Sequence, residues 1–187
     1  MEHLVERICV INYLYFIKDE LDVEGTSHNK PLYITMRCKD YTIIKVLVDN
    51  ISTLNVLPKH VLDEMSIDSM HMLPNTMIAR AYDGSPRQVV GTSEIEMFIG
   101  PQVFLVTLQV MDIHPSYNML LVRPLIHVIG VMASSFHQCL KYIVNGILVI
   151  VKAVETLAMV QNVAVPYIDV EGSKDGNLHA FEIINAE

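Results

Sequence analysis

The segment VLVDNISTLNVLP, residues 46–58, carries the side chains of this sequence that are best placed to do chemistry together. An apolar run ends in Asp49, continues through Asn50, Ile51 and Ser52, and then becomes apolar again. A carboxylate at the end of a buried strand is costly unless a hydrogen bond, a charge or a reaction uses it. Aspartate is more often a turn or capping residue than a catalyst, and Ser52 could bond the backbone of the same turn. From these residues alone, Asp49 is either a turn residue or an acid–base group.

The elements around Asp49 are predicted to be short strands. LYITMRC and TIIKVLVD alternate apolar with polar residues and are separated by a short turn, which predicts a hairpin that ends at Asp49. A second hairpin is predicted around Asp83 and Gly84, because an Asp-Gly pair favours a tight reversal. Further strands are predicted at VFLVTLQVMDI, NMLLV, LKYIV and ILVIV, and short helices at PKHVLDEM and RPLIHVIGV. Many short strands with few helices predict a mainly β, barrel-like domain.

The two ends of the chain differ from this central region. Residues 2–23 space their apolar side chains by three or four and predict a helix, and the polar segment EGTSHNKP then marks a boundary. Beyond Lys152 the sequence becomes polar and acidic, which is typical of a loose tail. The sequence therefore predicts an N-terminal helical extension or linker over residues 1–30, a domain over residues 31–152, and an acidic tail or linker over residues 153–187.

Composition limits the partners of the chain. With 187 residues, 51% of them hydrophobic, it is long enough for one domain with a substantial core. A formal charge of -8 and only 13 scattered Lys and Arg residues argue against nucleic-acid binding. No uninterrupted apolar segment reaches the roughly 18 residues of a membrane span, and no secretory signal is recognisable at the start. Three cysteines without a CxxC pair fit a reducing compartment. We therefore expect an intracellular, cytoplasmic protein that contacts neither nucleic acid nor membrane.

The histidines and cysteines do not predict a metal centre. The eight histidines have no tight ligand spacing, and no cysteine pair completes a zinc site. The common motifs for nucleotide binding, zinc proteases and serine hydrolases are also absent from the sequence. We expect no metal and no cofactor.

The order of these features resembles the retropepsin family of aspartic proteases, and more closely the protease segment of plant gypsy-type LTR retrotransposon polyproteins. The matching segments are HNKPLYITMRC, VLVDNISTLNVLPKHVL, ARAYDGSPRQVVG, IGPQVFLVTLQVMDIHPSYNMLLVRPLIH and GVMASSFHQCLKYIVNGILVIV. The resemblance covers roughly residues 28–151. It implies a mainly β, retropepsin-like (acid protease) closed barrel with short helices, preceded here by the N-terminal helix.

The resemblance also implies a catalytic role for the loop at Asp49. Asp49 would be the catalytic acid, supported by Asn50, Ile51 and Ser52. Because one chain supplies one such aspartate, a homodimer must bring two together, and the two carboxylates then share a proton and activate water against a peptide bond.

An enzyme with both catalytic groups in one chain would need a second aspartate loop. Asp112 follows a strand but lacks small residues behind it, and Asp169 lies in the predicted tail. Neither fits, so an aspartic protease of this sequence would act as a dimer.

The hairpin AYDGSPR would be the flap of such an enzyme. Tyr82, Asp83 and Gly84 would lie near its tip and close over an extended peptide, excluding water and orienting the substrate. The expected substrate is the polyprotein of the element itself.

Two residues depart from the family pattern. The glycine expected after Asp-Asn is Ile51, and the glycine expected after Leu120-Leu121 is Val122. Added bulk at a tightly packed site typically costs about 1–3 kcal/mol, and at a two-fold axis the cost occurs twice. We therefore predict an aspartic endopeptidase with impaired catalysis. The alternative is a catalytically inactive retropepsin-fold module for dimerisation or peptide binding, a degenerate retroelement fragment.

Overall fold

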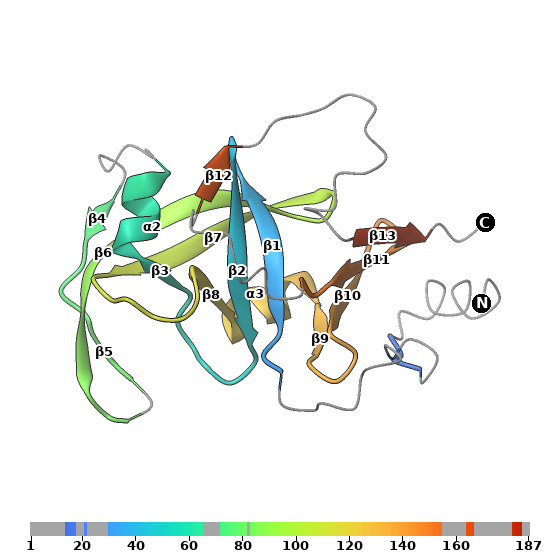
Figure 1. Ribbon diagram of the computed structural model, residues 1–187, viewed down its shortest axis with the longest axis horizontal. Helices are drawn as coiled ribbons and strands as arrows, with labels where there is room; N and C mark the ends of the chain where they lie inside the picture. Colours follow the sequence, from blue (N-terminus) through green and yellow to red (C-terminus); the bar gives the residue numbers. More distant parts are fainter. Residues whose placement is uncertain are drawn as a thin grey trace.

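The computed structural model describes residues 14–17, 21, 30–65, 72–81, 83–154, 164–166 and 181–184 (Figure 1). In this part of the chain the helices are α2 (Lys59–Glu64) and α3 (Arg123–Ile129). The strands are β1 (Tyr33–Cys38), β2 (Tyr41–Asp49), β3 (Val56–Pro58), β4 (Leu73–Pro74), β5 (Ile78–Arg80), β6 (Pro86–Ile99), β7 (Gln102–Met111), β8 (Met119–Val122), β9 (Met132–Ser134), β10 (Cys139–Val144), β11 (Ile147–Lys152), β12 (Ala164–Pro166) and β13 (Phe181–Ile184).

Six of these strands close into a barrel. Their order is β1-β2-β8-β3-β7-β6, and β6 pairs again with β1 through Arg37 with Phe98 and Cys38 with Met97. The pairs β2–β8 and β3–β7 are parallel, and the other neighbours are antiparallel. The predicted fold class, a mainly β closed barrel with short helices, is confirmed.

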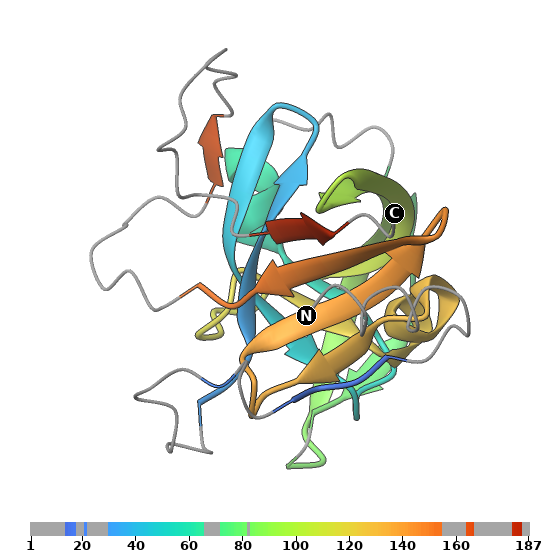
Figure 2. The same cartoon turned by 90° about the vertical axis from the view of Figure 1, so that its right-hand side faces the viewer.

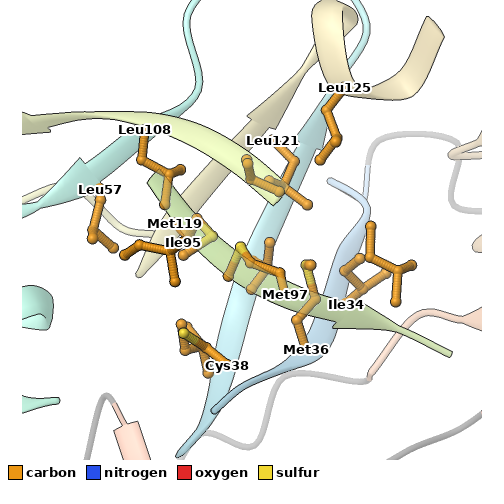
Figure 3. Close-up of a cluster of buried hydrophobic side chains, with 14 of the residues drawn as sticks. Ile34, Met36, Cys38, Leu57, Ile95, Met97, Leu108, Met119, Leu121 and Leu125 are labelled. Carbon is orange, nitrogen blue, oxygen red and sulfur yellow. The ribbon is translucent and has the colours of Figure 1, made fainter. Parts of the chain in front are cut away.

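The barrel forms because its strands alternate between the core and the outside. In β1, for example, every second side chain is buried. The buried side chains of several strands meet inside the barrel, where Figure 3 shows them pointing toward one another. The residues labelled there are Ile34, Met36, Cys38, Leu57, Ile95, Met97, Leu108, Met119, Leu121 and Leu125. Burial of this apolar surface is the main force that holds the strands in register.

The central elements agree with the predictions from the sequence. The β1–β2, β5–β6 and β10–β11 hairpins, the long strand β7, the short strand β8 and helix α3 all form where they are expected. Helix α2 begins at Lys59, one residue after the start of the predicted segment PKHVLDEM, and Pro58 is its N-cap residue. No helix in the described part of the chain has the length and hydrophobicity needed to cross a membrane.

The N-terminal segment differs from the prediction where the structure describes it. Residues 14–17 are not helical, and apart from Leu21 the rest of the predicted helix lies outside the described residues. Leu14 and Phe16, two positions apart, pack against the same apolar cluster on β10 and β11. The Lys141 Nζ donates a hydrogen bond of 2.8 Å to the Tyr15 carbonyl. A periodicity of two suits an extended segment lying against a sheet, and this explains why the helix is not formed here.

A second sheet lies beside the barrel, in the order β13-β11-β10-β9. Figure 2 shows its strands crossing in front of the barrel. On β10, Leu140 and Tyr142 belong to the barrel core, whereas Cys139 belongs to the cluster that residues 14–17 cover. This sheet is therefore buried on both faces, which accounts for the nearly continuous apolar sequence of β11.

Two short strands come from the region predicted to be a loose acidic tail. β12 pairs with β2, and β13 pairs with β11. Both are apolar segments, AVP and FEII, within a polar stretch of sequence. At these residues the backbone is paired with the rest of the fold, and the remaining residues of the tail after position 154 lie outside the described part.

Candidate active site

Asp49 is the last residue of β2 and lies beside Val122, the last residue of β8, in a parallel pair. In the same register Val48 is opposite Leu121, and both contribute to the barrel core. Since side chains alternate along a strand, Asp49 projects from the opposite face of these two strands. Leu120 shares that face with Asp49.

The Asp49 carboxylate is held by its own loop. Its Oδ1 accepts a hydrogen bond of 2.7 Å from the Ile51 backbone N–H, and its Oδ2 accepts one of 2.5 Å from the Ser52 hydroxyl. The first bond is the ordinary bond of an Asx-turn. Together the two bonds fix both carboxylate oxygens, and the side chain is half-buried. Of the three loop residues Asn50, Ile51 and Ser52, the last two bond the carboxylate directly, and the catalytic role of the loop stays a prediction.

Arg123 closes the same loop from helix α3. Its Nη2 donates a hydrogen bond of 2.8 Å to the Ile51 carbonyl, and its Nε donates one of 3.3 Å to the Asn50 carbonyl. This contribution was not predicted, although the Val-Arg-Pro sequence after the apolar pair places a guanidinium at a helix start. The two carbonyls of the loop thus acquire donors from an element more than 70 residues away.

These contacts shift the pKa of Asp49. Partial burial raises the pKa of its carboxyl. The hydrogen bonds from the Ser52 side chain and from the backbone N–H groups of Ile51 and Ser52, together with the charge of Arg123, lower the pKa by more than burial raises it. The pKa of Asp49 therefore lies below its ordinary value. In a single chain these contacts therefore favour the ionised form of the carboxylate. A second carboxylate brought into contact would raise one of the two pKa values, because like charges resist simultaneous ionisation.

Asn55 is a second residue of the site that the sequence analysis missed. It is buried, and its Oδ1 accepts a hydrogen bond of 2.9 Å from the Val122 backbone N–H. Its Nδ2 donates one of 3.2 Å to the Thr107 carbonyl, and its own carbonyl accepts one of 2.8 Å from the Gln109 N–H. One side chain thus joins the start of β3 to β8 and β7. The available signal was a single amide within the apolar sequence LNVL.

The β5–β6 hairpin forms the predicted turn. Gly84 has a φ of 78°, which glycine adopts without strain, and its N–H donates a hydrogen bond of 2.9 Å to the Ala81 carbonyl. The Asp83 Oδ1 accepts hydrogen bonds from the Ser85 N–H at 2.8 Å and from the Ser85 hydroxyl at 2.5 Å. Tyr82 lies outside the described residues. The role of this hairpin as a flap stays a prediction.

A small apolar cluster connects the base of this hairpin to the strands beside Asp49. Ala79 of β5 and Val89 of β6 share a buried cluster with Val56 of β3, and Leu120 of β8 packs against this cluster. Val56 and Leu120 are also paired across β3 and β8. The hairpin is therefore anchored to the face of the barrel wall that carries Asp49, and in Figure 1 it extends beyond the barrel in the same direction as the loop between β2 and β3.

The two departures from the family pattern have different surroundings. The Ile51 side chain is 80% exposed, so within one chain it is not overpacked. Val122 is 0% exposed and packs inside its own chain, where its N–H is bonded to Asn55. A clash of Ile51 would thus arise only between two chains.

The remaining acidic candidates do not join this site. Asp112 is exposed directly after β7, and Asp169 lies outside the described residues. Among the residues that the structure describes, no three His, Cys, Asp or Glu side chains come together where they could hold a metal ion.

Comparison with known proteins gives fold similarity alone. No family model matches the sequence, and no curated protein matches it. Similar solved structures include the retroviral protease-like domain of Ddi1 from Leishmania major, with 11% identity over 60% of this chain and 88% of that chain at a TM-score of 0.49. The EIAV protease in complex with an inhibitor has 12% identity over 57% of this chain and 94% of its own at a TM-score of 0.46. A retropepsin-like aspartic protease from Rickettsia conorii has 17% identity over 55% of this chain and 75% of its own at a TM-score of 0.40.

By name, all three are proteases or protease-like domains, and nothing about the activity of this chain follows from them.

Proposed function

We propose that this chain is a retropepsin-like aspartic endopeptidase domain of a retroelement polyprotein, of the plant gypsy type that its sequence resembles. It acts as a homodimer in which the two Asp49 side chains form the acid–base dyad. The observation that carries this proposal is the Asp49 carboxylate, held by Ile51 and Ser52 at the end of β2, on the wall to which the β5–β6 hairpin is anchored.

The proposed reaction needs two carboxylates in different protonation states. One ionised Asp49 takes a proton from water, whose oxygen attacks the carbonyl carbon of the scissile peptide bond, while the protonated Asp49 of the partner subunit donates its proton to the carbonyl oxygen. The C–N bond of the resulting tetrahedral intermediate then breaks: the leaving nitrogen takes the proton held by the first Asp49, and a hydroxyl of the new carboxylic acid returns a proton to the second. The bonds from Ile51 and Ser52 orient each carboxylate and favour its ionised form. Contact between the two Asp49 carboxylates opposes the ionisation of both at once, so the pair keeps one proton, which the two groups share. The substrate is an extended peptide beneath the hairpin.

Ile51 is expected to weaken this assembly. Its side chain is exposed in the single chain and would have to be accommodated where two loops meet. Overpacking of this kind costs about 1–3 kcal/mol at each site. We therefore expect the native protein to have low activity, mainly because Ile51 distorts or weakens the dimer.

A second candidate function follows from the same residue. If the two isoleucines keep the carboxylates apart, the chain is a catalytically inactive module that dimerises or binds peptides. Val122 gives little support to this alternative, because its side chain is buried within its own chain and does not stand between the two subunits' loops. The choice between the two functions therefore depends on Ile51.

The decisive experiment measures peptide cleavage at acidic pH, with and without pepstatin, for the native protein, Ile51→Gly, and Ile51→Gly combined with Asp49→Asn. Light scattering gives the oligomeric state of each protein. We expect weak cleavage by the native protein, stronger pepstatin-sensitive cleavage by Ile51→Gly, and none after Asp49→Asn. If Ile51→Gly is folded and dimeric but does not cleave, the inactive module is the better conclusion. A strictly monomeric chain would contradict the dyad.

A further inference from the structure

The register of the β5–β6 hairpin places its two arginines on opposite faces. Ala79 is paired with Arg87, whereas Arg80 is paired with Pro86. Residues directly opposite each other in an antiparallel pair share a face, and neighbours along a strand alternate. Arg87 therefore shares a face with Ala79, and Arg80 projects from the other face.

The face that carries Arg87 is the one turned toward the candidate active site. Ala79 and Val89 are 9% and 0% exposed, and both belong to the apolar cluster against which Leu120 packs; Leu120 lies on the same strand face as Asp49. Val89 is two residues after Arg87 and so points the same way. On the opposite face Ile78 is 65% exposed. We call the face of Ala79, Arg87 and Val89 the inner face, and the face of Ile78 and Arg80 the outer face.

Arg87 continues the inner face from its apolar base toward the turn. Its side chain is exposed, and in the described part of the chain its guanidinium makes no hydrogen bond or ion pair. Its positive charge nevertheless acts on Asp83 in the turn. The pKa of Asp83 lies below its ordinary value, mainly through the hydroxyl and N–H of Ser85 and further through the positive charge of Arg87. A guanidinium whose donors have no partner among the described residues thus stands on the inner face of a hairpin, in a chain with a formal charge of -8.

We propose that Arg87 is a specificity-determining residue that selects extended peptides with an acidic side chain opposite the inner face of the hairpin. This inference rests on the proposed function, because it assumes that a peptide lies between the hairpin and Asp49. The planar guanidinium matches a carboxylate with two parallel hydrogen bonds. Closure of the hairpin over the peptide removes water and so strengthens the attraction between the two charges.

The test uses pairs of fluorescent extended peptides that differ only by Glu or Gln, with the substituted position moved along the peptide. Binding is measured by anisotropy in the Asp49→Asn background, which prevents cleavage, for the parent and for added Arg87→Gln or Arg80→Gln. Arg80→Gln is the matched control, because it removes the same charge from the outer face of the same hairpin. Pepstatin binding is measured separately with Asp49 intact.

We expect the parent to prefer the Glu peptide by about three- to tenfold at one position, a preference typical of a partly desolvated charge pair. Arg87→Gln should remove the preference, Arg80→Gln should leave it, and higher salt should reduce it. Equal loss in both variants, or no preference in a protein that binds pepstatin, would overturn the inference while leaving the proposed function in place. A folded dimer that binds neither pepstatin nor any peptide would overturn both. Glu preference without pepstatin binding would support the role of Arg87 in the inactive module.

Discussion

The Oδ1 of the buried Asn55 accepts a hydrogen bond of 2.9 Å from the backbone N–H of Val122, and Val122 is the residue paired with Asp49. The position of the candidate catalytic carboxylate therefore depends on a side chain six residues further along the sequence. The same amide also reaches the Thr107 carbonyl on β7. This one group therefore connects the start of β3 to β8 and β7, and β8 is in turn paired with β2.

Replacement of Asn55 by alanine should destabilise the fold. It leaves the Val122 N–H and the Thr107 carbonyl without partners inside the protein, and an unsatisfied buried polar group costs about 1–3 kcal/mol. Urea unfolding followed by circular dichroism measures the loss. Asn50→Ala is the matched control, because the Asn50 side chain is exposed and the change should stay within about 0.5 kcal/mol. Equal effects of the two substitutions would contradict the role assigned to Asn55.

The pH dependence of stability should report the environment of Asp49. Its pKa in the folded chain is below the ordinary value, so the unfolded chain binds more protons at this group. The stabilisation is fully present above the ordinary pKa and is lost as pH falls through the lowered value. Asp49→Asn should therefore reduce stability most at neutral pH and progressively less toward acid. Urea unfolding at dilute, monomeric concentrations over a pH series measures the difference, and a constant difference at all pH values would refute the interpretation.

The two departures from the family pattern should respond differently to replacement by glycine. Val122→Gly removes a fully buried side chain and adds a flexible residue to β8, which should cost about 2–4 kcal/mol. Ile51→Gly removes an exposed side chain and should change the stability of the single chain by less than about 1 kcal/mol. Thermal unfolding of both variants measures the contrast. A severe loss in Ile51→Gly would show that the isoleucine is packed in the native assembly.

Tyr142 should stabilise the contact between the second sheet and the barrel. Its hydroxyl donates a hydrogen bond to the Ile99 carbonyl at the end of β6, and burial raises the pKa of the phenol to about 12, so the proton stays in place. Tyr142→Phe leaves that carbonyl unpaired and should cost about 1–3 kcal/mol.

Tyr33→Phe is the control for this change, because the half-buried Tyr33 makes no hydroxyl hydrogen bond in the described part of the chain. Chemical denaturation compares the two variants. A loss of stability in Tyr33→Phe as large as that in Tyr142→Phe would contradict the assignment.

Local patterns were sufficient to predict most of the barrel. Alternation of apolar residues predicted β1, β2 and β7, and the Asp-Gly pair predicted the turn between β5 and β6. These signals are local because strand alternation and turn chemistry act over a few residues. The N-terminal segment was predicted wrongly at residues 14–17, since contact with a distant sheet overrides local periodicity.

The site was predictable in its centre but not in its supports. Asp49 and Ser52 are close in sequence, so their contact follows from the loop itself. Arg123 and Asn55 act on that loop and on Val122 from other elements. Such partnerships depend on which strands become neighbours, and nothing in the spacing of these residues indicates them.

The amino-acid sequence was enough to predict that an aspartate ends a buried strand, that an isoleucine follows it where the resembling family has glycine, and that a hairpin around Asp83 and Gly84 comes later. The folded chain was needed to show that Val122 is accommodated within its own chain, that Ile51 points to solvent, and that Arg87 rather than Arg80 shares the face of Ala79 and Val89. The physical reason is that residue types and turns are set by local chemistry. Exposure, register and the direction of a side chain are set by contacts between segments that are distant in the sequence.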